Sequence, residues 1–286
     1  IALKPVLFGS LAAIGLPGVA VVNAIAGLGF LYSSPRLLAR ALRPLVSGAL
    51  RALIGRGRSI VIVQNDSDHA ELLRRRLARP DQIRLMRGAG VQLDVFSMRP
   101  EPEGTPIAAF AGRLIWDKGV GQFVAAARLL RERGVAARFV LVGEPDADNP
   151  AAVLPETLQK WQRDGTVELW GRRADMPEVL SSVHVICLPS TYGEGVPKIL
   201  LEAASSGRAV VTTDWPGCRQ TVMDGVTGLV VPPRDEAALA DAMGRLLTDH
   251  PLRRGFGLAA RALAEREFDV RNVVAATLSI YQQLSE

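Results

Sequence analysis

Two glutamates, Glu194 and Glu202, lie eight positions apart in the tract EGVPKILLE. Pro197 stands between them, and proline is favoured at the first turn of a helix because its missing N–H has no partner there. The spacing therefore predicts a helix over 196–206 with Glu194 in the loop before it. A rise of about 1.5 Å per residue would place the two carboxylates roughly 12 Å apart along the helix axis. That span fits a ligand with hydroxyl groups at both ends and a diphosphate between them.

The start of this predicted helix could also hold phosphate. Backbone N–H groups at a helix N-terminus carry partial positive charge, and here they belong to Gly195, Val196 and Lys198. In the alternative interpretation, Glu194 is an acid near the helix cap and Glu202 is a solvated helix residue. This tract alone leaves both interpretations open.

A second tract, GRLIWDKG at 112–119, directly follows an apolar run at 107–111 that predicts a strand. Gly112 at the strand end would let a ligand approach the backbone, and Arg113 and Lys118 would offer two cations. Arginine grips phosphate through two N–H groups, and lysine acts as a mobile point charge. We expect a helix over 118–132, and a lysine at its N-terminus opposes the helix dipole unless an anion such as a diphosphate binds there. In the alternative, Lys118 is a solvated residue.

From about residue 105, short β-branched runs alternate with amphipathic stretches. The runs predict strands at 107–111, 138–142, 167–170, 185–188, 209–212 and 228–231. The stretches between them predict helices at 118–132, 155–163, 176–182, 196–206, 217–223 and 235–247. Apolar strands separated by helices indicate a parallel sheet covered on both faces. We therefore expect a doubly wound α/β domain that binds its ligand at the carboxyl ends of the strands.

The first hundred residues contain fewer such units. They predict strands at 19–22 and 60–64, a helix at 68–77, a strand entering a glycine turn at 83–91, and at the chain end a helix at about 269–285. The Pro- and Glu-rich tract RPEPEG at 99–104 is the predicted domain boundary. We expect a first domain over 1–104, a second over 105–266, and a C-terminal helix over 267–286 that could return to the first domain.

Charge is distributed unevenly along the 286 residues. The overall net charge is +5, but residues 1–100 hold 14 Lys and Arg against 5 Asp and Glu, whereas residues 101–286 hold 20 against 24. A basic first part suggests an anionic partner, either a membrane surface or a phosphorylated substrate. No pattern of aromatic and basic residues suggests nucleic acid.

Cysteine and histidine usage argues against disulfides and metal sites. Cys187 and Cys218 are expected to be reduced structural thiols, which indicates a reducing compartment. The three histidines, His69, His184 and His250, lack metal-ligand spacing. Two aspartate pairs, at 66 and 68 and at 146 and 148, could be read as metal ligands, but we interpret the first as a helix N-cap and the second as an exposed loop. No metal is expected.

Two segments bear on membrane contact. Residues 5–31 carry no charge, but Pro17 and several glycines divide them into pieces that suit a helix, a turn and a strand better than a membrane span. The stretch 35–54 predicts an amphipathic helix with arginines opposite its apolar face and Pro44 inside it. It is either a core-packed surface helix or a basic helix that rests on an anionic leaflet.

Several tracts in this order resemble retaining glycosyltransferases of family 4, which have the GT-B fold of two Rossmann-like domains. They are GRLIWDKG at 112–119, FVLVGEP at 139–145, VELWG at 167–171, EGVPKILLE at 194–202 and PGCRQTVMDGVTGLVVPP at 216–233. The resemblance covers 105–265. The front half resembles it in part, through 23–32 and 87–96, although many relatives carry a histidine where this chain has Ala26. Complete members begin roughly 90–100 residues before Ile1, so we expect the N-terminal part of the acceptor domain to be missing.

The resemblance implies roles for the residues of these tracts. Arg113 and Lys118 would hold the donor diphosphate, with Gly112 allowing its close approach. Glu202 would accept hydrogen bonds from the ribose, and Glu194 would contact the donor sugar. The amides of Gly195, Val196 and Lys198 would assist around Pro197, and Gly171 and Arg172 would lie at the base pocket. In the alternative, Arg172 is a plain surface cation.

The implied reaction is glycosyl transfer with retention from a nucleoside-diphosphate sugar, with uridine as the expected base, and without a cofactor or metal. The transferred group would be a hexosyl or N-acetylhexosaminyl unit. The front half resembles bacterial members that act on polyprenyl-diphosphate-linked sugars, which implies surface polysaccharide biosynthesis by a cytoplasmic protein, peripheral at the inner face of the cell membrane. This chain by itself is expected to bind a nucleoside diphosphate but to transfer weakly. The alternatives are a non-catalytic nucleotide-sugar-binding module and a GT-B sugar-nucleotide epimerase.

Overall fold

A computed structural model describes residues 3–16, 18–28, 37–55, 57–193 and 195–285. Contacts between residues divide the chain into two compact units. The first unit comprises Ile1–Gly90, Tyr192–Pro197 and Val270–Glu286, and the second comprises Val91–Thr191 and Lys198–Asp269. Each unit is an α/β structure built on a parallel sheet, as the alternating pattern predicts.

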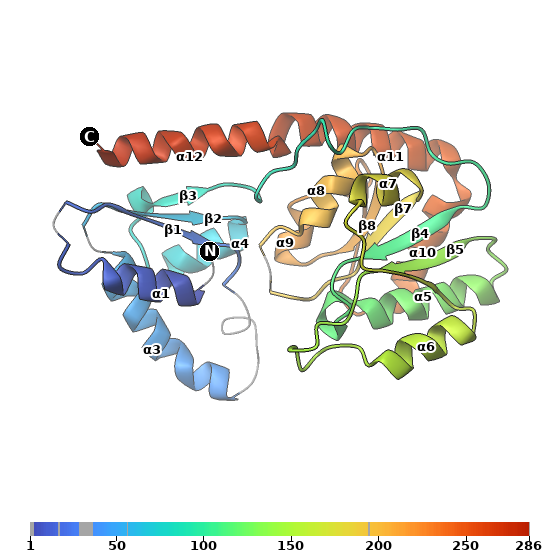
Figure 1. The fold of residues 1–286 in the computed structure, drawn as a ribbon, viewed down its shortest axis with the longest axis horizontal. Coiled ribbons are helices and arrows are strands. Elements are labelled where there is room, and N and C mark those ends of the chain that lie inside the picture. The colour runs from blue at the N-terminus through green and yellow to red at the C-terminus, as the bar shows by residue number, and fades with distance from the viewer. Residues whose placement is uncertain (1–2, 17, 29–36, 56, 194, 286) are drawn as a thin grey trace. The chain divides into compact units, whose positions relative to one another are not determined.

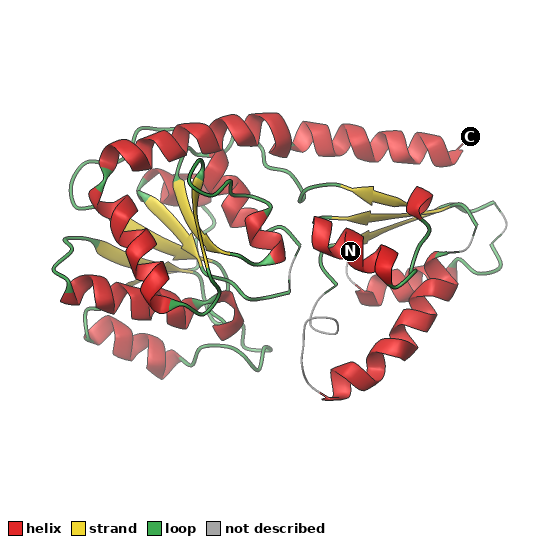
Figure 2. Ribbon diagram, turned by 180° about the vertical axis from the view of Figure 1, so that it is seen from behind, coloured by secondary structure: helices red, strands yellow, loops and turns green. Residues whose placement is uncertain are grey.

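The second unit contains a sheet of six parallel strands in the order β6-β5-β4-β7-β8-β9. The strands are β4 (Ile107–Ala111), β5 (Arg138–Val142), β6 (Glu168–Gly171), β7 (Val185–Leu188), β8 (Ala209–Thr213) and β9 (Gly228–Val231). Three of the six strands, β4, β7 and β8, are buried at every residue, and β5 is buried at all but its first, because helices cover both faces of the sheet (Figures 1 and 2). The strand order reverses between β4 and β7, and in such sheets ligands bind at that point beyond the carboxyl ends of the strands.

Helices join these strands close to the predicted positions. They are α5 (Val120–Glu132), α6 (Pro155–Arg163), α7 (Met176–Ser181), α8 (Lys198–Ser205), α9 (Pro216–Arg219), α10 (Glu236–Thr248) and α11 (His250–Leu263). Helix α9 is much shorter than the predicted 217–223. Helix α8 begins at Lys198, after Pro197, rather than at 196. Between α11 and the last helix lies one turn of π-helix, Ala264–Phe268.

The first unit contains a three-stranded parallel sheet in the order β1-β2-β3. Its strands are β1 (Val21–Ile25), β2 (Ser59–Val63) and β3 (Ile83–Leu85), and its helices are α1 (Leu3–Ala12), α3 (Leu37–Ile54), α4 (Asp66–Arg74) and α12 (Val270–Ser285). A 3₁₀ turn, Pro80–Gln82, precedes β3. The strand predicted at 83–91 ends at Leu85, so most of that stretch is loop. Helix α12 belongs to this unit, since Ile280 packs against Ile60 and Ile62 of β2.

Local chemistry explains two boundaries in the first unit. Asn65, rather than Asp66, caps α4, because its side-chain oxygen accepts the backbone N–H of Asp68 at 2.8 Å. The uncharged front segment folds as a helix, a turn and a strand, and the Asn23 amide of β1 donates to the Ser10 hydroxyl of α1 at 3.0 Å. No helix among the described residues is both long and apolar enough to cross a bilayer.

Helix α3 shows both faces of the predicted amphipathic pattern. Leu50 and Ile54 are buried in the core of the first unit, whereas Leu42 and Leu45 are exposed, Leu45 by 71%. Arg51 is tied back to the fold, because its guanidinium donates to the carbonyls of Arg75 and Arg76. The helix therefore packs through its second half, and Leu42 and Leu45, on either side of Pro44, face solvent.

The segment 91–104 packs on the second unit, so the contacts divide the chain at Gly90 rather than at Gly104. The Ser205 hydroxyl of α8 donates to the Phe96 carbonyl at 2.7 Å. Arg261 of α11 donates to the carbonyls of Leu93 and Phe96. Composition placed the domain boundary at 99–104, but Ser205 and Arg261 hold the backbone before that tract against the second unit.

Candidate functional site

A pocket of about 650 Å³ lies at the carboxyl ends of β4, β5 and β6 in the second unit. Its lining comprises Gly112, Arg113, Val142, Gly143, Glu144, Pro145, Asp146, Ala147, Arg172, Arg173 and Met176. Neighbouring parallel strands end at the same edge, and so the loops after 111, 142 and 171 meet there. The pocket brings together Gly112, Arg113 and Arg172 of the predicted site, with Gly171 at the end of β6 beside it.

Three glycines let these loops approach closely. Gly112 and Gly143 have φ values of 151° and 140°, and a Cβ on Gly143 would overlap the carbonyl oxygen of Gly112. The Gly143 N–H donates to the Gly171 carbonyl at 2.8 Å, and the Gly112 N–H donates to the Val142 carbonyl at 2.9 Å. These hydrogen bonds fix the backbone at this edge of the sheet, and so they also fix the positions from which its side chains extend.

Each basic residue of the pocket has an acidic neighbour. Arg113 Nη1 lies 2.7 Å from Asp146 Oδ2, and Arg172 Nη1 lies 3.1 Å from Glu144 Oε1. All four side chains are partly exposed, and such pairs contribute little to stability in water. An entering anion could replace either carboxylate without a large conformational cost. Asp146 thus serves as a counter-ion of Arg113, and the interpretation of its pair with Asp148 as metal ligands is not supported.

Arg173 and Asp175 form a third pair beside the pocket. Arg173 Nε donates to Asp175 Oδ1 at 2.7 Å. This hydrogen bond lowers the pKa of Asp175 to about 2, so the carboxylate keeps its charge at lower pH than an ordinary aspartate.

The described residues contain no group of three or more His, Cys, Asp or Glu side chains placed to hold a metal ion.

Lys118 does not begin helix α5, contrary to the expected helix at 118–132. It ends a 3₁₀ turn, Trp116–Lys118, and Gly119 after it has a φ of 84°, so the regular helix starts at Val120. A Cβ at Gly119 would overlap the Pro189 carbonyl, which explains the glycine. Lys118 is not among the residues that line the pocket. Its position one turn before an α-helix still suits an anion in front of that helix.

Glu202 lies in α8 with 7% of its surface exposed, so it is not the solvated helix residue of the alternative interpretation. The Lys198 ammonium lies 3.4 Å from its carboxylate, one turn earlier in the helix. Burial raises the pKa of Glu202, and the charge of Lys198 opposes this effect. A buried carboxylate that pairs with one exposed lysine has capacity left to accept hydrogen bonds from a ligand.

The residues before α8 belong to the first unit by their contacts. The Gly195 N–H donates to the Ala26 carbonyl at 2.8 Å, and the Val196 N–H contacts the Gln64 side-chain oxygen at 3.3 Å. Both amides are therefore engaged by protein acceptors, and a phosphate could use them only after these bonds open. Glu194 lies outside the described residues, so its predicted distance from Glu202 is not tested.

Sequence reasoning missed the acidic side of the pocket. Glu144 and Asp146 follow β5 as Arg113 follows β4. The apolar run of β5 before them could have indicated that they lie at the same edge of the sheet as Arg113. The predicted structural role of the two cysteines agrees with the fold, since Cys187 and Cys218 are both buried and free.

A sequence profile described as "Glycosyl transferases group 1" matches residues 105–249, just over half of the chain. The N,N'-diacetylbacillosaminyl-diphospho-undecaprenol alpha-1,3-N-acetylgalactosaminyltransferase of Campylobacter jejuni is 27% identical over 274 residues, which cover 91% of this chain and 69% of that protein. The alpha-maltose-1-phosphate synthase of Mycolicibacterium smegmatis is 31% identical over 228 residues, which cover 72% of this chain and 58% of that protein.

Among solved structures, that of Anabaena Alr3699/HepE in complex with UDP superposes with a TM-score of 0.79 at 19% identity. The match covers 97% of this chain and 77% of that chain. This similarity supports the fold alone, and with the parallel sheets of both units it confirms the predicted GT-B type.

Proposed function

Because the chain belongs to the group 1 glycosyl transferases, we propose that it is part of a retaining enzyme that transfers a sugar from a nucleoside-diphosphate sugar. The single observation that carries this proposal is the pocket at the carboxyl ends of β4, β5 and β6, where Arg113 and Arg172 meet. In a doubly wound sheet this edge is where a nucleotide binds.

Arg113 and Lys118 would hold the donor diphosphate. Asp146 neutralises Arg113 at 2.7 Å in the structure, and a diphosphate carries more charge than one carboxylate and would displace it. During transfer the bond from the anomeric carbon to the diphosphate breaks while the acceptor oxygen bonds to that carbon from the same face. The departing diphosphate takes the proton of the acceptor hydroxyl. The two cations would stabilise the charge that develops on the leaving group.

Glu202 would accept hydrogen bonds from the ribose hydroxyls, which its buried carboxylate is suited to do. The Lys198 ammonium would favour the charged form of this carboxylate in the absence of a ligand. Gly171 and Arg172 would border the base, and Glu194 would contact the sugar. We propose uridine as the base, supported by the fold similarity to a protein solved with UDP.

For the acceptor we propose a glycan or a polyprenyl-diphosphate-linked sugar in surface polysaccharide biosynthesis. The Campylobacter jejuni relative is named for a diphospho-undecaprenol substrate, and this supports the lipid-linked alternative. Contact with the inner face of the cell membrane is proposed as well. It is supported by the basic first hundred residues and by the exposed side chains of Phe8, Leu11, Leu42 and Leu45.

Calorimetric titration with UDP, GDP and ADP tests the donor site directly. We expect one nucleotide to bind the wild-type chain and Arg113→Gln to weaken that binding by roughly tenfold or more, the value of a charge-assisted hydrogen bond. Arg163→Gln is the matched control, an exposed arginine of α6 away from the pocket. Binding by none of the nucleotides, or equal loss in both variants, would count against the proposed site.

Flotation with vesicles tests the membrane proposal separately. Vesicles that contain anionic lipid should carry the chain upward, and neutral vesicles should carry less of it. Equal recovery with both lipid mixtures would remove the membrane part of the proposal and leave the donor site unaffected.

A further inference from the structure

A second pocket of the same unit, of about 540 Å³, lies away from the β4–β6 edge. It is lined by Met98, Arg99, Pro100, Glu101, Gly207, Arg208, His250 and Arg254. A volume of this size is typical of sites for small molecules. Three arginines and a histidine face one glutamate here, so the lining is basic. None of these residues has a role in the proposed transfer reaction.

Arg208 is the innermost cation of this pocket, with 1% of its surface exposed. Its guanidinium donates only to backbone carbonyls, those of Leu180 at 2.7 Å, Pro100 at 3.0 Å and Ser181 at 3.4 Å. Within the described part of the chain no carboxylate lies at ion-pair distance from it, and its Nη1 group makes no hydrogen bond. A buried charge that lacks a counter-ion is costly, and this cost would fall if an anion entered.

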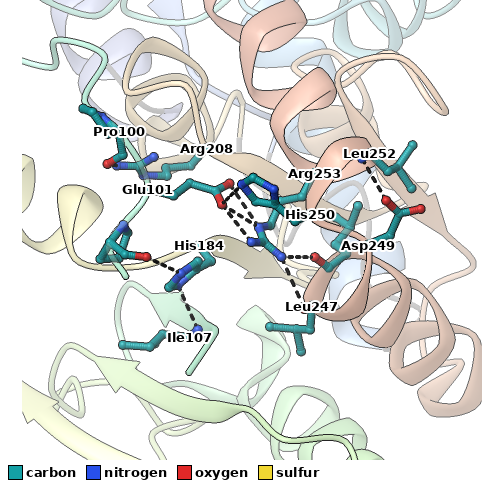
Figure 3. Close-up of polar contacts among 12 residues, drawn as sticks. Pro100, Glu101, Ile107, His184, Arg208, Leu247, Asp249, His250, Leu252 and Arg253 are labelled. Carbon is teal, nitrogen blue, oxygen red and sulfur yellow. Dashed lines mark hydrogen bonds and ion pairs between the residues drawn. The ribbon is translucent and has the colours of Figure 1, made fainter. Parts of the chain in front are cut away.

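Glu101 attracts Arg208 through space but does not pair with it, because other cations already engage its carboxylate. Arg253 contacts its carboxylate with Nε at 3.0 Å and Nη2 at 2.8 Å, and His250 Nε2 lies 3.5 Å away (Figure 3). Arg253 is itself buried and also donates to the carbonyls of Leu246 and Leu247. The close pair of Glu101 and Arg253 is therefore neutral, and the remaining arginines leave the lining of the pocket with an excess of positive charge.

The outer part of the pocket adds further positive charge. Arg254 is exposed and follows His250 by four residues, so both side chains lie on one face of α11. Among the described residues Arg254 has no ion-pair partner, and Arg99 has a weak one, Glu178 at 3.5 Å with both side chains about half exposed. The first turn of α11, a helix of 14 residues, contributes the positive end of its dipole at this place.

We propose that this pocket binds a small phosphate monoester, with the phosphate between Arg208, Arg254 and Arg99. Arginine forks match the geometry of phosphate oxygens, and a buried arginine is suited to such a ligand because its guanidinium is weakly hydrated. The remaining volume, next to Met98 and Pro100, accommodates the organic part of the ester. The proposal is independent of the donor site, since the two pockets share no residue.

Calorimetric titration with ribose 5-phosphate, with inorganic phosphate, and with uncharged ribose tests this site. The titrations use the Arg113→Gln chain, so that phosphate binding at the donor pocket does not contribute to the signal. We expect ribose 5-phosphate and phosphate to bind and ribose not to bind. Adding Arg254→Gln should weaken phosphate binding by roughly tenfold, and adding Arg245→Gln, an exposed arginine of α10 outside the pocket, should not change it.

Arg208→Lys provides a second variant, with circular dichroism to verify the fold, because truncation of a buried arginine can unfold the domain. It keeps the charge but loses the fork and should also weaken binding. Equal affinity in the Arg113→Gln, Arg254→Gln and Arg208→Lys chains would overturn the proposal. So would phosphate binding that is present in the wild type and lost in Arg113→Gln alone. Flotation with phosphatidic acid vesicles that depends on Arg254, without binding of free phosphate, would assign the pocket to a lipid headgroup and overturn it too.

Discussion

Arg113 Nη1 lies 2.7 Å from Asp146 Oδ2, so the cation that follows β4 is neutralised by a carboxylate that follows β5. The two residues lie 33 positions apart in the sequence and meet because β4 and β5 are adjacent parallel strands. This pair couples ligand binding to charge exchange. On the proposed function, a diphosphate at Arg113 would have to displace Asp146, and the aspartate would compete with the ligand.

Replacement of Asp146 by asparagine should tighten binding of the nucleoside diphosphate. It removes the internal competitor, and a gain of about 0.5–1 kcal/mol is expected from the strength of exposed ion pairs. The gain should shrink as salt is added, because screening weakens the original pair. Titration at low and high salt measures both effects, with Asp164→Asn, an exposed aspartate paired with Arg128 outside the pocket, as control. Weaker binding by Asp146→Asn would show that the carboxylate assists the ligand.

Glu202→Gln should remove discrimination between ribose and deoxyribose nucleotides. In the proposed site the wild-type carboxylate would accept hydrogen bonds from the ribose, each worth about 1.5–3 kcal/mol for a charged acceptor, so a 2′-deoxynucleotide should bind it more weakly. In Glu202→Gln the two nucleotides should bind nearly equally, whereas Glu132→Gln on the exposed face of α5 should keep the wild-type ratio. An unchanged ratio in Glu202→Gln would place the ribose elsewhere.

Glu202 should also make stability depend on pH. Burial raises its pKa above the value of the unfolded chain, so the folded state binds its proton more tightly. Glu202 therefore destabilises the fold least at a pH below its pKa in the unfolded chain. The free energy of unfolding then falls as the pH rises through the pKa of Glu202 in the folded protein. Glu202→Gln should gain stability relative to wild type at pH 7.5 and much less at pH 4. Urea unfolding at both pH values measures the difference, and an equal effect at both would contradict the pKa argument.

Gly143→Ala should destabilise the second unit more than other glycine substitutions. Its φ of 140° is unfavourable for alanine, and the new Cβ would overlap the Gly112 carbonyl, so about 3 kcal/mol or more is expected. Gly134→Ala is the matched control, since its φ is 73° but its Cβ would meet open space. It should cost about 1 kcal/mol. Similar melting temperatures for the two variants would show that the β4 and β5 loops can separate.

The amino-acid sequence by itself determined the layered architecture of the second unit. Apolar runs such as 107–111 and 185–188 coincide with β4 and β7, because a strand that is buried on both faces tolerates only apolar residues. Helix ends were less accurate. Lys118 was expected in helix α5, which instead begins two residues later. The turn at Gly119 sets this start, and it depends on the close approach of Pro189, 70 positions away in the sequence.

Tertiary structure alone decided which charges meet. Arg113 and Arg172 could be named from their tracts, but their partners Asp146 and Glu144 come from a different loop, and the sheet order brings them together. The same holds for Glu202, because only the folded structure shows that its side chain is buried and not solvated. Local sequence encodes strand and helix through periodicity, whereas ion pairs and burial depend on residues distant in the chain.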